Sequence, residues 1–140
     1  MSSAVLFVYN KESGFMVITH FGGKKICNDL KDIEQELQFR TQKRVNEFIL
    51  YYEKESFPYL VILANKDSAY LHYFKEEDDP GFRSIGNENE KGESIFYTNT
   101  DKEEVVIENM SIVNFSLAVM AAKEFYETKE RPKCVKWDEL

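Results

Sequence analysis

Two short apolar runs flank a polar segment at the start of the chain. The runs "AVLFVY" (4–9) and "FMVITH" (15–20) are rich in β-branched and aromatic residues, and a turn-forming Ser13–Gly14 pair lies between them. This pattern predicts a β-hairpin. The Gly22–Gly23 doublet predicts a further turn, which leads into a first helix.

The apolar spacing becomes helical within residues 28–43. Apolar residues recur there at intervals of three and four, namely Leu30, Ile33 and Leu37. Either Asn28 or Asp29 is suited to cap the N-terminus of this helix.

Six runs with strand character follow the first helix. They are "RVNEFILYYE" (44–53), "FPYLVILANK" (57–66), "AYLHYFKE" (69–76), "FRSIG" (82–86), "SIFYTNT" (94–100) and "EVVIE" (104–108). The first three are separated only by short turn segments rich in Asn, Asp and Ser, so we expect them to form an antiparallel meander. Pro80 and two glycines place loops around the brief fourth strand.

A second helix is predicted within residues 111–129. Its apolar stripe consists of Val113, Leu117, Met120, Ala121 and Phe125, and Ser111 lies near its start. The helix should end before Pro132, because the residue that precedes a proline avoids helical geometry. The segment "CVKW" (134–137) then predicts a closing strand with Val135 and Trp137 on one face.

These elements together predict an α+β fold. We expect an antiparallel meander sheet of about six to eight strands with two helices packed on one face. The 140 residues suffice for a single domain over residues 1–140, and no repeat or linker divides them.

The negative charge is concentrated in one segment of the chain. Residues 76–108 contain eleven acidic and three basic residues, a net charge of −8, while the whole chain carries −7. Blocks of like charge are commonly solvated surface, and the functional alternative is a docking face for a basic partner.

The cysteine pattern favours a reducing compartment. Cys27 and Cys134 are isolated from each other, so a disulfide framework is not expected. The N-terminal apolar run lacks the length and basic lead of a secretory signal, and the longest apolar stretch is far shorter than the roughly 20 residues that span a bilayer. We therefore expect a cytoplasmic protein that does not bind membranes.

Catalytic and metal-binding patterns are weak throughout. No two of the histidines and cysteines have metal-ligand spacing, so we expect no metal. We also expect no cofactor and no catalytic residues. The segment "HFGGKK" (20–25) lacks the other residues of a phosphate-binding loop. The remaining enzymatic alternative is a small ligand-binding or enzymatic α+β domain with a pocket near His72, where Tyr70 and Glu76 are the nearby titratable residues.

The tail "AVMAAKEFYETKERPKCVKWDEL" (118–140) resembles the C-terminal signature of a known family. This family is the immunity family numbered one of bacterial polymorphic toxin systems, whose members end in a helix, a Gly/Lys-Glu-Arg-Pro turn and a short strand with tryptophan followed by acids. The matching positions here are Phe125, Arg131, Pro132, Val135, Trp137, Asp138 and Glu139. The family commonly has glycine where this chain has Lys129. The segment 58–86 is also similar, so the resemblance covers about residues 57–140.

The resemblance implies a non-enzymatic inhibitor of a cognate secreted toxin domain, often a nucleic-acid deaminase and otherwise a nuclease. Such a toxin offers a cationic groove to phosphates, which an acidic inhibitor can occlude. We predict toxin contacts within the acidic segment, at Glu76, Glu77, Asp78, Asp79, Phe82, Glu88, Glu90, Glu93 and Tyr97. The expected partner is the toxin protein, with no direct nucleic-acid contact, and the free chain should be a monomer or weak dimer.

The tail is expected to act as a structural clasp formed by Pro132, Cys134 and Trp137. The proline ends the helix, and the indole of Trp137 can bury roughly 200 Å² against the helix face. At about 25 cal/mol per Å² this burial is sufficient to hold a terminal strand against fraying. Trp137 as a binding hot spot is the alternative.

Overall fold

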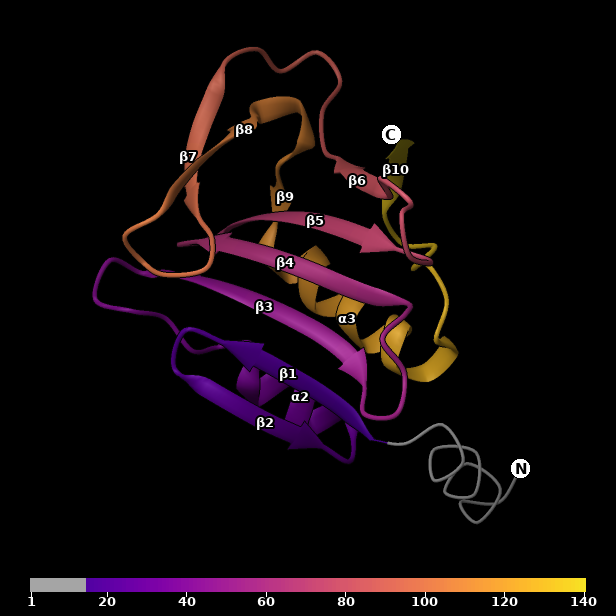
Figure 1. Ribbon diagram of the computed structural model, residues 1–140. Helices are drawn as coiled ribbons and strands as arrows, with labels where there is room; N and C mark the ends of the chain where they lie inside the picture. The colour runs from indigo at the N-terminus through magenta and orange to yellow at the C-terminus, as the bar shows by residue number, and fades with distance from the viewer. Residues whose placement is uncertain (1–14) are drawn as a thin grey trace.

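Residues 15–140 are described in the computed structural model, which has three layers (Figure 1). The main sheet contains β1 (Met16–His20), β2 (Gly23–Cys27), β3 (Val45–Tyr52), β4 (Tyr59–Asn65), β5 (Ser68–Phe74), β6 (Phe82–Ile85), β9 (Val113–Asn114) and β10 (Lys136–Glu139). Its strand order is β10-β6-β5-β4-β3-β1-β2, and β9 pairs with β5. All strand pairs are antiparallel, which confirms the predicted α+β meander.

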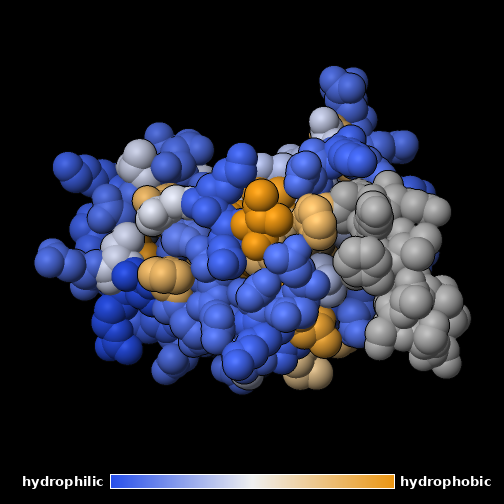
Figure 2. Space-filling view, turned by 90° about the horizontal axis from the view of Figure 1, so that it is seen from below, coloured by the Kyte–Doolittle hydropathy of each residue, from blue (hydrophilic) through white to orange (hydrophobic). Residues whose placement is uncertain are grey.

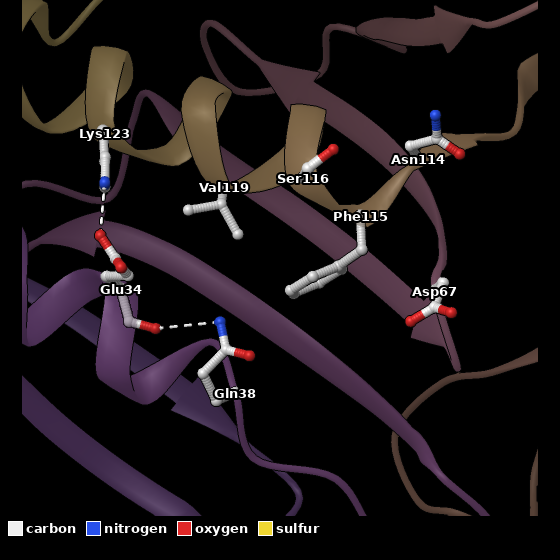
Figure 3. A pocket seen from close by; sticks show the side chains of 8 residues that line it. All are labelled: Glu34, Gln38, Asp67, Asn114, Phe115, Ser116, Val119 and Lys123. Carbon is white, nitrogen blue, oxygen red and sulfur yellow. Dashed lines mark hydrogen bonds and ion pairs between the residues drawn. The ribbon is translucent and has the colours of Figure 1, made fainter.

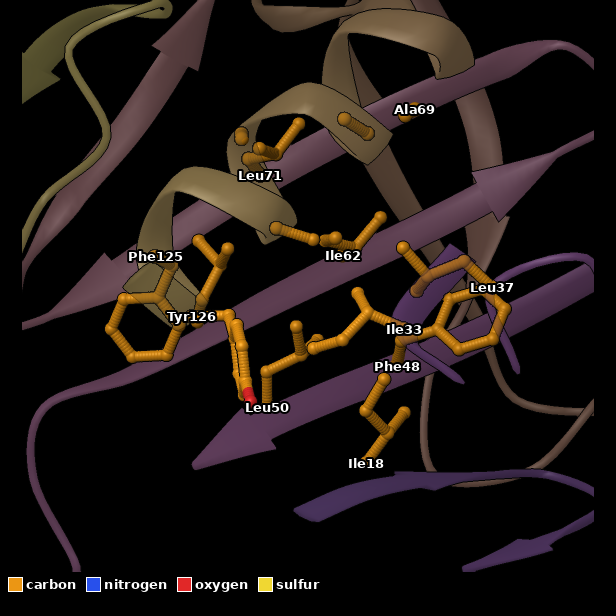
Figure 4. Close-up of a cluster of buried hydrophobic side chains, with 14 of the residues drawn as sticks. Ile18, Ile33, Leu37, Phe48, Leu50, Ile62, Ala69, Leu71, Phe125 and Tyr126 are labelled. Atoms are coloured by element: carbon orange, nitrogen blue, oxygen red, sulfur yellow. The ribbon is translucent and has the colours of Figure 1, made fainter. Parts of the chain in front are cut away.

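Two helices cover one face of this sheet, α2 (Leu30–Glu36) and α3 (Phe115–Thr128). A separate hairpin of β7 (Glu93–Tyr97) and β8 (Glu104–Glu108) covers part of the opposite face. Alternate residues of the central strands point to the two layers, as period-2 geometry requires. The helix-facing core includes Phe48, Leu50, Ile62, Leu71 and Phe125 (Figure 4).

The Gly22–Gly23 turn leads into a strand that the sequence did not predict. The first run (4–9) lies outside the described residues, and β1 instead pairs with β2, with His20 opposite Gly23. The sequence of β2 is "GKKIC", and four of its five residues are exposed. Because β2 is an edge strand, it needs no alternating apolar residues, and its lysines disfavour pairing with another chain. The view from below is accordingly mostly hydrophilic, with scattered hydrophobic residues (Figure 2).

The first helix follows the predicted capping chemistry. The side chain of Asp29 accepts a hydrogen bond from the amide of Asp32 at 2.8 Å, so Asp29 is the N-cap. Ile33 and Leu37 are buried against the sheet, as their spacing predicts.

The second helix begins later and faces the sheet differently than predicted. A 3₁₀ turn (Asn109–Ser111) and β9 precede it, so α3 starts at Phe115. The buried residues of α3 are Phe115, Ala118, Ala121, Ala122, Phe125 and Tyr126. Met120 is 57% exposed, so its place in the predicted stripe is wrong. The alanines face the sheet because their small side chains allow the helix to pack closely.

The C-terminal strand returns to the sheet as predicted. After α3, Lys129 adopts a left-handed conformation (φ 60°, ψ 20°), which glycine accommodates without strain and which explains the glycine of the resembling family. β10 then pairs antiparallel with β6, with Trp137 opposite Ser84. The indole Nε1 of Trp137 donates to the carbonyl oxygen of Pro132 at 2.7 Å, and its half-buried ring packs against the core.

The β7–β8 hairpin forms a second, smaller core on the opposite face of the sheet. Leu63 of β4, Phe96 of β7 and Ile107 of β8 are buried there together. This contact explains why Leu63 is buried although it points away from the helices. The hairpin thereby becomes a fixed, raised feature of the surface.

Candidate functional site

The outward face of the β7–β8 hairpin brings acidic and apolar residues together. Strand register places Glu93 opposite Glu108, Ile95 opposite Val106 and Tyr97 opposite Glu104. The alternate residues point inward, including the buried Phe96. The outward face therefore has an apolar centre between acidic ends.

The apolar centre of the hairpin is exposed to solvent. Ile95 is 38% exposed and Val106 is 53% exposed. In residues 15–140, these two are the only exposed large hydrophobic residues that are direct strand partners. Paired exposed apolar side chains with a polar surround are typical of protein-binding surfaces.

At one end of the hairpin face, two carboxylates oppose each other. Glu93 and Glu108 face each other across the strands, an arrangement that destabilises a hairpin. Arg83 of β6 partly offsets this, since its Nη1 lies 3.2 Å from Glu108 Oε1 and its Nε lies 2.9 Å from Asp138 Oδ2. Local arrangements that reduce stability are common at functional sites.

Side-chain hydrogen bonds hold the hairpin against the sheet. The side-chain amide of Asn65 donates to the carbonyl oxygen of Ile95 at 2.9 Å. Glu47 of β3 accepts hydrogen bonds from the Thr98 hydroxyl at 2.7 Å and from the backbone N–H of Asn99 at 2.9 Å. The hairpin face is thus preorganised, which lowers the entropic cost of binding a partner.

The predicted contact residues are divided among several places. Glu93 and Tyr97 share the outward hairpin face, and Tyr97 lies 4.8 Å from Lys43 Nζ. Glu88 and Glu90 are exposed in the β6–β7 loop, where Glu88 forms an ion pair with Lys136.

The remaining predicted residues lie before or within β6. Glu76, Glu77 and Asp78 are exposed in the β5–β6 loop, and half-buried Asp79 accepts a hydrogen bond from the amide of Gly81. Phe82 is on the helix side of the sheet, beneath the guanidinium of Arg131 at 4.1 Å.

Sequence reasoning missed Ile95, Glu104, Val106 and Glu108. The alternation in "ESIFY" and "EVVIE" contains the signal, because it separates two faces of each strand. It does not show which face points outward, since both faces carry apolar residues.

His72 is held by local hydrogen bonds. Its Nε2 donates to the carbonyl oxygen of Pro80 at 2.8 Å, and its Nδ1 accepts from the Tyr70 hydroxyl at 3.1 Å. The ring also stacks on Phe74 at 4.1 Å. Glu76 is exposed in the loop and makes no contact with this group in the described part of the chain. The arrangement is that of a structural histidine and does not favour the enzymatic alternative.

The pKa of His72 leads to a prediction about stability. Burial lowers this pKa from 6.5, so the neutral ring is favoured in the folded state. The contribution of the neutral His72 ring to the free energy of unfolding is present above pH 6.5. It is lost as the pH falls through the lowered pKa, by at most about 1.4 kcal/mol per pH unit. Urea unfolding of wild type and His72→Gln from pH 7.5 to 5 measures it. The wild type should lose more stability than the variant, and parallel curves would contradict the prediction.

A hollow of about 490 Å³ lies between α2 and α3 (Figure 3). Two of its charged residues are already paired, because Lys123 Nζ lies 2.5 Å from Glu34 Oε2. The ring of Phe115 at its floor is covered by the guanidinium of Arg40 at 4.1 Å. These contacts stabilise the helix pair and leave no converging set of catalytic groups in the hollow.

The two thiols lack the features of reactive cysteines. Burial and nearby carboxylates raise the pKa of Cys27 to about 12. Burial and the Glu124 carboxylate raise the pKa of Cys134 to about 11. In residues 15–140, no group of three or more histidine, cysteine or acidic side chains is placed to hold a metal ion. None of the helices described is long and apolar enough to cross a membrane.

Comparison with known proteins shows similarity to immunity proteins. The family described as "Immunity protein Imm1" matches residues 26–139. The chain is also 31% identical over 125 residues to the "Double-stranded DNA deaminase immunity protein" of Burkholderia cenocepacia (strain H111). This match covers 89% of the chain and 100% of the relative.

Proposed function

Because the chain belongs to the Imm1 family of immunity proteins, we propose that it binds and neutralises a toxin domain that deaminates DNA. The Burkholderia relative is an immunity protein against a double-stranded DNA deaminase, which supports a toxin of this class as the partner. The outward hairpin face supports this assignment of the binding site, because Ile95 and Val106 form an exposed apolar pair between carboxylates there.

The charge of the hairpin is complementary to a protein that binds DNA. Residues 93–108 contain five acidic residues and one lysine. An enzyme that acts on DNA must present cationic side chains to the phosphates. The carboxylates of Glu93, Glu104 and Glu108 can occupy those positions in place of phosphates, and the apolar pair provides desolvated contact area at the centre.

The proposed mechanism is steric and electrostatic occlusion without chemistry by the inhibitor. The acidic hairpin steers association with the cationic toxin, and the docked body then excludes DNA from the deaminase site. Glu76, Glu77, Asp78 and Asp79 remain proposed contacts at the edge of this surface, together with Glu88 and Glu90. The inhibitor acts in the cytoplasm in this scheme, as a monomer or weak dimer before it meets the toxin.

Charge reversal on the hairpin tests the proposed site. The purified chain should inhibit DNA deamination by the cognate toxin domain at one-to-one stoichiometry. Glu93→Lys with Glu104→Lys should slow association by about tenfold or more at low salt, because steering is lost. The difference should shrink as salt is raised, since salt screens exposed charges. Stopped-flow binding over a salt series measures both effects.

The matched control reverses two exposed carboxylates elsewhere, Glu53→Lys with Glu127→Lys, which changes the net charge equally. Equal slowing by both pairs would mean that only the overall charge matters. A third pair, Glu76→Lys with Glu77→Lys, measures separately how much the β5–β6 loop contributes to the association rate. If the wild-type chain fails to inhibit the deaminase, the proposed function itself is wrong.

A further inference from the structure

A hollow of about 680 Å³ lies on the helix side of the sheet, away from the acidic hairpin. Its aromatic lining is Tyr73 of β5, Phe82 of β6 and Trp137 of β10. The turn after α3 closes it on one side and contributes Glu130, Arg131, Pro132 and Lys133. Tyr73 and Phe82 are partners on neighbouring strands, and Trp137 joins them from the distant C-terminal strand only in the folded sheet.

The hollow is basic although the protein is acidic. Lys75, Arg131 and Lys133 line it, against the single carboxylate of Glu130. Among residues 15–140, these three cations take part in no ion pair. A local excess of unpaired cations on a chain of net charge −7 favours an anionic ligand at this place.

One polar group in the hollow has no partner. Tyr73 is only 5% exposed, and its hydroxyl makes no hydrogen bond with any described residue. Solvent reaches the oxygen of this hydroxyl from the hollow, so the hydroxyl is available to a bound group. The hydroxyl can donate to a carboxylate oxygen.

One cation that lines the hollow is already oriented. The guanidinium of Arg131 lies 4.1 Å from the centre of the Phe82 ring, so its planar edge remains available for two parallel hydrogen bonds. The indole N–H of Trp137 is used by Pro132, so the ring offers only its apolar face. Together these groups suit a carboxylate next to an aromatic or aliphatic side chain.

We propose that this hollow binds an acidic segment of a partner protein, with a carboxylate on Arg131 and Tyr73 and an adjacent apolar side chain on Trp137. The residue types agree, since tryptophan, tyrosine and arginine are enriched at the centres of protein interfaces. A protein segment fits better than a small molecule, because Arg131 and Lys133 are exposed whereas small-molecule sites bury most of the ligand. The inference goes beyond toxin inhibition and holds whichever face binds the toxin.

The fluorescence of Trp137 tests this inference directly, because it is the only tryptophan of the chain. The probes are three short blocked peptides in which phenylalanine alternates with glutamate, glutamine or lysine. The glutamate peptide should change the emission of Trp137 in a saturable way, and the other two should not. Arg131→Glu should weaken its binding by about tenfold or more, because a charge-assisted hydrogen bond is replaced by repulsion.

The matched control is Lys24→Glu, an exposed charge reversal on β2 at the other edge of the sheet. It should leave peptide binding unchanged, and thermal melts should show that both variants are folded. Equal responses to the glutamate and glutamine peptides would overturn the inference. Tighter binding of adenosine monophosphate or a short DNA oligonucleotide than of the glutamate peptide would also overturn it, in favour of a nucleotide site.

Discussion

Val106→Arg is expected to weaken binding of the deaminase toxin domain by about a hundredfold or more. Val106 is 53% exposed at the centre of the hairpin face, directly opposite Ile95. The variant removes apolar contact area and places a cation against the cationic surface of the partner. Like charges buried at an interface cost several kcal/mol, so the effect should exceed that of losing one rim carboxylate. Isothermal titration calorimetry with the purified toxin domain measures it.

Met120→Arg is the matched control for this experiment, because Met120 is a similarly exposed hydrophobic residue on α3. It should leave toxin affinity unchanged. Val106→Thr preserves the branched shape without charge and should cost less than about tenfold. If Met120→Arg weakens binding and Val106→Arg does not, the toxin binds the helix side and the hairpin site is wrong.

Phe125→Ala is expected to lower the free energy of unfolding by about 3–5 kcal/mol. Phe125 is fully buried between the sheet and α3, with its ring centre 5.9 Å from that of Tyr52 and 6.1 Å from that of Tyr73. The substitution leaves a cavity that the surrounding strands cannot fill, because they are fixed by pairing on both sides. Urea unfolding at neutral pH measures the loss.

Met120→Ala in the same helix should change the stability by less than about 0.5 kcal/mol. The apolar stripe predicted from the sequence contains both Met120 and Phe125, whereas only Phe125 is buried in the structure. Comparing the two variants therefore shows which of the two descriptions of the helix is correct. A comparable loss for both variants would support the stripe predicted from the sequence.

The local sequence determined the elements of the central meander. The alternation in β3, β4 and β5 and the short turns between them specify antiparallel neighbours, because each strand can bury its apolar residues only in that register. Asp29 caps the first helix, and Pro132 lies beyond the end of the second, since both residues act on backbone groups within a few positions. The concentration of acidic residues between 76 and 108 is likewise a property of the sequence alone.

Only the tertiary structure decided which faces point outward. Both faces of β7 and β8 carry apolar residues, and burial of Phe96 and Ile107 against Leu63 is what exposes Ile95 and Val106. The rotation of α3 depends in the same way on how closely its alanines approach the sheet. The basic hollow requires Tyr73, Phe82 and Trp137 to meet across three strands. Local propensity sets backbone conformation, whereas exposure and neighbourhood arise from contacts between residues far apart in the chain.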